Sequence, residues 1–183
     1  LTYVAIVCDV PHIQKVLPQF VIANERTIPA PLLGHLRSRS PSNFHLLRER
    51  TAWVTTAIMC RIVRALSAAL APFRAEYQPI FSFDACKAHL APAVFTACAA
   101  AKLWPLVVPA RMTWLLQPLD THVLSLFKAA LQQAFQAARI RAADGRVDLS
   151  DLLTSVYAAT QLVLEGRSWA HAFDSDGFVP AQS

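Results

Sequence analysis

The stretches that decide the fold are Phe81-Ser-Phe-Asp-Ala-Cys-Lys-Ala-His89 and Val108-Pro-Ala-Arg-Met-Thr-Trp-Leu-Leu-Gln-Pro-Leu-Asp120. An apolar run leads into Asp84 in the first stretch, and a second apolar run precedes the loop that reaches Asp120. The 35 residues between these carboxylates predict one helix and one more strand. Strand, helix and strand in this order indicate a right-handed parallel crossover, and ligands of α/β folds collect at the carboxyl ends of such strands. The sequence therefore predicts an α/β fold that brings two acids together around a divalent metal.

The other elements are predicted from apolar periodicity. Two strand-like runs, Thr2–Cys8 and Val16–Ala23, predict an antiparallel hairpin joined by a turn. The segment Asn24–Arg50 holds three prolines and is predicted to be a long irregular excursion. Helices are predicted over 51–70, 92–102, 120–142 and 148–166, then a short helix with Trp169 and a frayed tail over 174–183, with Asp144-Gly145 as a break. We expect an α/β core over residues 1–145 and a helical extension packed on it over 146–183.

The composition limits the class of protein. A chain of 183 residues that is 55% hydrophobic can bury a sizeable core. Its mean hydropathy is +0.36, but the longest run without Lys, Arg, Asp or Glu, Ala88–Ala101, is shorter than the roughly 20 residues of a membrane span. We therefore expect no membrane segment. The net charge of +5 fits a polyanionic partner such as nucleic acid, and it equally fits an ordinary solvated surface.

The four cysteines show no Cys-x-x-Cys spacing, which argues against a structural zinc site. Their apolar surroundings predict reduced, buried thiols and a reducing intracellular compartment. No signal peptide is visible, and the chain begins at Leu1 inside a strand-like run. We therefore expect a fragment of a longer protein.

Each of the two acids also has a plain structural interpretation. Asp84 can cap a turn at a strand end, and Asp120 can cap a helix, where the helix dipole favours a carboxylate without any metal. The two acids, in this order along the chain, indicate a metal site more specifically than either acid does alone. Hard divalent cations take oxygen ligands, and two such ions can clamp the attacking and leaving oxygens of phosphoryl transfer.

The residues around the acids resemble a known family. Phe-Asp84-Ala-Cys-Lys-Ala-His89 is similar to the Asp-Asn-Ala-x-x-His segment of DDE-type transposases of the mariner/pogo superfamily. The segment Thr113-Trp-Leu-Leu-Gln-Pro-Leu-Asp120, followed by Phe127-Lys128, resembles their pogo-like Gln-Pro-Leu-Asp segment. The resemblance implies an RNase H-like core, in which a mixed sheet combines an antiparallel hairpin, a parallel crossover and flanking helices.

The same resemblance implies an activity. It indicates a transposase- or integrase-like endonuclease that cuts DNA and transfers strands, with Mg²⁺ or Mn²⁺ at a two-metal site. Asp84 would be the second metal-binding acid and Asp120 the third. His89 would orient a ligand or contact substrate, with a capping or core histidine as the alternative. The partner would be DNA, the intact protein would form a homodimer, and a eukaryotic protein would be nuclear.

The chain departs from the family in two ways. Ala85 replaces the usual Asn. Asp9 also ends a strand-like run, but we expect it to be a turn residue. Because only two strand-like runs precede the helix predicted at Thr51, we expect the first strand, with its acid, to lie upstream of Leu1.

Two other functions stay open. A catalytically inactive RNase H-like module, derived from a transposase and binding nucleic acid or protein, would tolerate Ala85 and the missing acid. An unrelated small α/β enzyme would need a glycine-rich phosphate loop, which the four glycines do not form. Trp114 is expected to pack in the core, with a DNA contact as the alternative.

Overall fold

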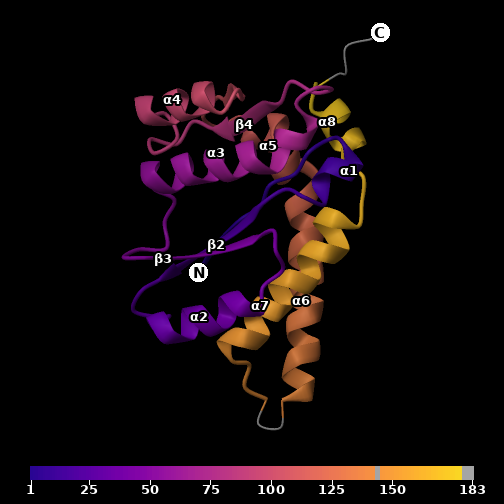
Figure 1. Cartoon of the computed structure of the whole chain (residues 1–183). Helices are drawn as coiled ribbons and strands as arrows, with labels where there is room; N and C mark the ends of the chain where they lie inside the picture. Colours follow the sequence, from indigo (N-terminus) through magenta and orange to yellow (C-terminus); the bar gives the residue numbers. More distant parts are fainter. Residues whose placement is uncertain (143–144, 179–183) are drawn as a thin grey trace. The chain divides into compact units, whose positions relative to one another are not determined.

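The computed structural model describes residues 1–142 and 145–178 (Figure 1). They form two compact units, each made from two segments of chain. The first unit comprises Leu1–Ile6 and Val16–Gln117, and the second comprises Val7–Lys15 and the residues from Pro118 onward. The predicted domain boundary at residue 145 lies inside the second unit and stays a prediction.

The first unit contains a three-stranded sheet centred on β2 (Gln19–Asn24). The strand β1 (Thr2–Val4) pairs with β2 in antiparallel register, with Thr2 opposite Ile22, so the predicted antiparallel pairing is confirmed. The chain between them forms the short helix α1 (Pro11–Gln14) rather than a simple turn. Five of the six residues of β2 are buried, as expected for a strand covered on both faces.

The segment predicted as an irregular excursion instead contains a helix and a strand. These are α2 (Ala30–Ser38) and β3 (Phe44–Glu49), and β3 lies parallel to β2. Pro29 is the N-cap of α2 and Pro31 lies in its first turn, where proline is tolerated because no amide donor is needed. The prolines therefore begin a helix. Three strands precede the first long helix, so the predicted count of two is wrong.

That long helix, α3 (Thr56–Leu70), begins at Thr56 rather than at Thr51. Thr55 is its N-cap, and its side-chain oxygen accepts a hydrogen bond from the Ile58 amide at 3.3 Å. The short 3-10 turn η1 (Ala71–Phe73) follows it. The buried face is apolar and consists of Ile58, Met59, Ile62, Val63, Leu66 and Leu70.

The predicted strand–helix–strand unit is confirmed. The strands β4 (Ile80–Asp84) and β5 (Trp104–Val108) are parallel, and α4 (Pro92–Ala100) connects them. The register pairs Asp84 with Val108, so both strands end at the same edge. The helix α4 runs beside α3 (Figure 1). The Thr56 hydroxyl donates to the carbonyl of Ala88, 3.2 Å away, just before α4.

The second unit is helical. It contains α6 (Leu124–Arg141) and α7 (Leu149–Ala159), which lie side by side (Figure 1), then the π-helical turn η3 (Thr160–Glu165) and α8 (Ala170–Ser175). The predicted cap is confirmed, because the Asp148 carboxylate accepts from the Asp151 amide at 2.8 Å. Asp144 of the predicted break and residues 179–183 of the predicted frayed tail lie outside the described residues. The core of the unit includes Val123, Phe127, Leu153, Val163, Leu164 and Trp169.

One stretch of the described residues, Thr56–Phe73, is long and apolar enough to cross a membrane, with a mean hydropathy of 1.4. It coincides with α3 and η1, and it carries Arg61 and Arg64. The buried face of α3 is equally typical of a helix that packs in a protein core.

Replacing Gly166 with alanine is expected to destabilise the protein by about 1–3 kcal/mol, because overpacking forces the backbone to shift. A Cβ atom there would lie 2.8 Å from the carbonyl oxygen of Leu162. Gly34, inside α2, is the matched control, since its Cβ would meet nothing within 4 Å. Gly34→Ala should stabilise by about 0.5–1 kcal/mol through helix propensity. Urea denaturation measures both, and equal effects of the two substitutions would contradict the steric argument.

Candidate functional site

Asp84 is the last residue of β4 and lies where the strand ladder ends. The next amide, of Ala85, donates to the carbonyl of Val108 at 3.1 Å, which holds this strand end against β5. The carboxylate keeps 44% of its surface exposed. One of its oxygens, Oδ1, lies 2.6 Å from Nδ1 of His89. The side chain is thus fixed on one side and open to solvent on the other.

His89 is brought to Asp84 by a tight turn. The amide of Cys86 donates to the carbonyl of Asp84 at 2.9 Å, and the amide of His89 donates to the carbonyl of Cys86 at 2.9 Å. The imidazole is only 15% exposed and meets the ring of Phe83 edge-on, with centroids 5.9 Å apart. An ionised carboxylate only accepts hydrogen bonds, so Nδ1 of His89 is the donor. The contact fixes the imidazole against Asp84, and the ligand-orienting role of His89 stays a prediction.

The loop after β5 leads through α5 (Thr113–Leu116) towards Asp120. Trp114 is 67% exposed in this loop, so the prediction that it packs in the core is wrong. Its indole Nε1 donates to the carbonyl of Arg111 at 2.9 Å. Arg111 itself has a φ of 67°, the left-handed conformation that residues other than glycine rarely adopt.

Asp120 lies in η2 (Leu119–Val123), a π-helical turn that leads directly into α6. Such turns are rare and occur frequently at functional sites. The N-cap of η2 is Pro118, and no side chain forms a capping hydrogen bond there. The structural interpretation of Asp120 as a helix cap is therefore wrong. Asp120 is exposed. Its carboxylate is available to an external ligand.

Asp176 is a buried acid that the sequence analysis missed. Its carboxylate is 5% exposed, accepts from the Thr121 hydroxyl at 2.6 Å and lies 3.3 Å from Nε2 of His122. Thr121 and His122 directly follow Asp120, so Asp176 ties the turn that carries Asp120 to the end of α8. The prediction of a frayed tail is therefore wrong for this residue. A single acid in a short polar segment carries no periodic signal that would reveal its burial.

The predicted site residues are distributed over both units. Asp84 and His89 belong to the first unit, and Asp120 belongs to the second. Asp9 is an exposed residue at a bend of the second unit. Within residues 1–142 and 145–178, no group of three or more His, Cys, Asp or Glu side chains could hold a metal ion. The approach of Asp84 to Asp120 stays a prediction.

The cysteines are free thiols. Burial of Cys8 raises its thiol pKa to about 12, and the neighbouring Asp9 adds to this rise. Burial also raises the pKa of Cys98, assisted by Cys60. Cys98 is buried as predicted, whereas Cys86 is exposed. Cys8 remains protonated at neutral pH and is a poor nucleophile.

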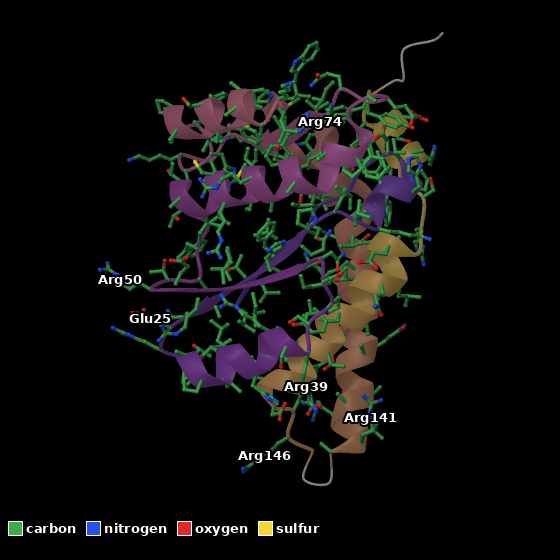
Figure 2. The ribbon with its side chains drawn as sticks, in the orientation of Figure 1. Glu25, Arg39, Arg50, Arg74, Arg141 and Arg146 are labelled. Carbon is green, nitrogen blue, oxygen red and sulfur yellow. The ribbon has the colours of Figure 1, made fainter. Side chains whose placement is uncertain are left out.

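Several of the seven arginines between Arg37 and Arg74 serve the fold. Arg37 donates twice to the carbonyl of Leu46, at 3.0 and 2.8 Å, and Arg48 donates to the carbonyl of Ile28 at 2.8 Å. Arg74 donates to the carbonyl of Ala101 at 2.6 Å. By contrast, Figure 2 shows the exposed side chain of Arg50 projecting from the chain after β3. The positive charge is therefore partly structural, which neither sequence interpretation anticipated.

The first unit thus combines a small mixed sheet with a separate parallel sheet, and an oriented carboxylate ends one parallel strand. This mixed α/β architecture is compatible with a DDE nuclease. The family described as DDE superfamily endonuclease matches residues 2–173, and the chain belongs to this family. No curated protein and no solved structure matches the chain. Family membership indicates a transposase-like nuclease with DNA as substrate, and enzymes of the family generally use divalent metals.

Proposed function

We propose that this chain forms part of the RNase H-like catalytic core of a pogo-like transposase, which cleaves DNA and transfers its strands. The observation that carries the proposal is Asp84, held at the end of a parallel strand by His89 with its other oxygen free for a ligand. The Gln117-Pro-Leu-Asp120 segment, which leads from α5 into the η2 turn, supports the same assignment. The family match covers both segments.

The two acids fit a divalent metal by their chemistry. Oδ1 of Asp84 is occupied by His89, which leaves Oδ2 on a half-exposed side chain, and Asp120 is exposed. Carboxylate oxygens are the ligands that Mg²⁺ and Mn²⁺ prefer. Bound metal would activate water or a 3′-hydroxyl and offset charge on the leaving oxygen. His89 would limit the rotation of Asp84 and so hold its second oxygen in place for the metal.

We further propose that a strand carrying the first acid precedes Leu1. Although three strands precede α3, β3 is parallel to β2, so only β1 and β2 form an antiparallel pair. The two sheets of the first unit share no hydrogen-bonded strand among the described residues. Upstream sequence without an acid-bearing strand would contradict this proposal.

Two properties of the intact protein are proposed from the family resemblance. A transposase of this kind would act as a homodimer. In a eukaryotic host it would act in the nucleus, a reducing compartment that suits four free thiols.

The alternative is an inactive module that binds nucleic acid or protein. Ala85, in place of the family's asparagine, favours it. Calorimetric titration with Mn²⁺ distinguishes the catalytic core from the inactive module. The catalytic core predicts that Asp84→Asn and Asp120→Asn each weaken Mn²⁺ binding. Unchanged affinity in both variants would favour the module.

His89→Ala is expected to weaken Mn²⁺ binding about 10–100-fold, the usual effect of removing a group that orients a metal ligand. The reason is the loss of the 2.6 Å contact that holds Asp84. His35→Ala is the matched control, because His35 is an exposed histidine of the same unit. The same titration measures both variants, and equal affinities would show that His89 merely fills space.

A further inference from the structure

Trp114 combines high exposure with a fixed position. Its side chain is 67% exposed, although its one polar atom is already bonded to the carbonyl of Arg111. This bond restricts the rotation of the indole and removes its only donor. The flat faces of the ring remain for contact with a partner. The ring can therefore stack on another flat group, but it has no donor left for a hydrogen bond to that group.

The loop that carries Trp114 begins at the strand edge that carries Asp84. The last residue of β5, Val108, is the register partner of Asp84. Backbone hydrogen bonds fix the loop, since the Met112 amide donates to the carbonyl of Pro109 at 3.1 Å and the Leu116 amide to the carbonyl of Met112 at 2.9 Å. The loop that carries Trp114 thus starts from the same end of the parallel strand pair as the candidate acid Asp84.

Arg111 gives the loop its charge and its shape. Its left-handed backbone is a strained conformation, and residues held in such conformations cluster at functional sites. Its side chain is exposed, three residues before Trp114. An exposed cation and an exposed aromatic ring in one loop are the combination that binds single-stranded nucleic acid, where bases stack and phosphates pair with basic groups.

We propose that Trp114 is a stacking platform for an unpaired base of the DNA substrate, with Arg111 contacting the adjacent phosphate backbone. The proposal rests on the proposed function only in taking DNA as the substrate. Bases within a duplex are already stacked on their neighbours, so an unpaired base is the ligand that a free indole face accepts. Because the indole donor is occupied, the contact should show little sequence preference.

The test uses the full-length protein in EDTA and two fluorescent DNAs of identical duplex sequence, one blunt and one with an unpaired overhang. Fluorescence anisotropy should show that the wild type prefers the overhang. Trp114→Ala should lose that preference by about 5–100-fold, the usual effect of removing one stacked base contact, and Trp114→Phe should keep most of it. Trp104→Ala is the matched control, since Trp104 is 63% exposed at the opposite end of β5.

The outcomes separate this inference from the proposed function. If Trp114→Ala weakens binding to both DNAs equally, or weakens binding to neither, the stacking role is overturned. The proposal that the protein acts on DNA would still stand. A wild-type protein that binds neither DNA at low salt would overturn both proposals. If Trp114→Ala instead abolishes self-association in sedimentation and leaves DNA binding unchanged, the exposed indole serves a protein contact and the inference is wrong. Circular dichroism confirms that each variant is folded.

Discussion

Asparagine in place of Asp84 or Asp120 is expected to lower metal-dependent DNA cleavage by the full-length protein by more than about 100-fold. Loss of a group that merely orients a metal ligand already costs about 10–100-fold, and loss of the ligand itself should exceed this. Asparagine keeps the size of the side chain but removes the negative charge that attracts Mg²⁺. Nicking of a plasmid in Mg²⁺ and in Mn²⁺ measures the rate.

Asp9→Asn is the control for this experiment. Asp9 is an exposed carboxylate at a bend, and no role in metal binding is assigned to it. Its variant should cleave at the wild-type rate. Substantial cleavage by Asp84→Asn or Asp120→Asn would remove that residue from the proposed metal site. Loss of activity in Asp9→Asn would instead identify Asp9 as the missing acid.

Asp176→Ala is expected to destabilise the protein by about 2–4 kcal/mol, because it removes a buried carboxylate that contacts two partly buried side chains, Thr121 and His122. The carboxylate is almost fully buried against Thr121 and His122, at 2.6 and 3.3 Å. For a chain of this size the loss corresponds to a fall of roughly 5–15 °C in Tm. Thermal unfolding followed by far-UV circular dichroism measures it.

Asp174→Ala is the matched control for Asp176, because Asp174 is an exposed acid on the same short helix. Its effect should stay within about 0.5 kcal/mol, as for most surface substitutions. Amide hydrogen exchange adds a local readout, since Asp176→Ala should speed exchange within η2, the turn that carries Asp120. Equal stability of the two variants would show that Asp176 does not hold this turn.

The elements predicted best were those with strong local signals. The apolar strands around Asp84 and Val108, and the helix between them, are present with only small shifts at their ends. The Asp148 cap was also predicted correctly. Such features depend on residues close in sequence, such as a proline in the first turn or a carboxylate beside free amides.

The segment before α3 was predicted wrongly because its signals were ambiguous. Pro29 and Pro31 suit the start of a helix as well as a loop. The outcome depends on β3, which becomes a strand only by pairing with β2. Parallel pairing joins residues far apart in sequence, so a local pattern does not reveal it.

The sequence by itself determined the family, the choice of Asp84 and Asp120 as candidate acids, and the strand–helix–strand order of the unit that contains Asp84, because each follows from contiguous residues. Only the tertiary structure decided what surrounds them. It placed His89 against the carboxylate of Asp84, exposed Trp114 and buried Asp176 against the residues that follow Asp120. Burial and side-chain contact depend on packing between distant segments, which residue type and spacing do not specify.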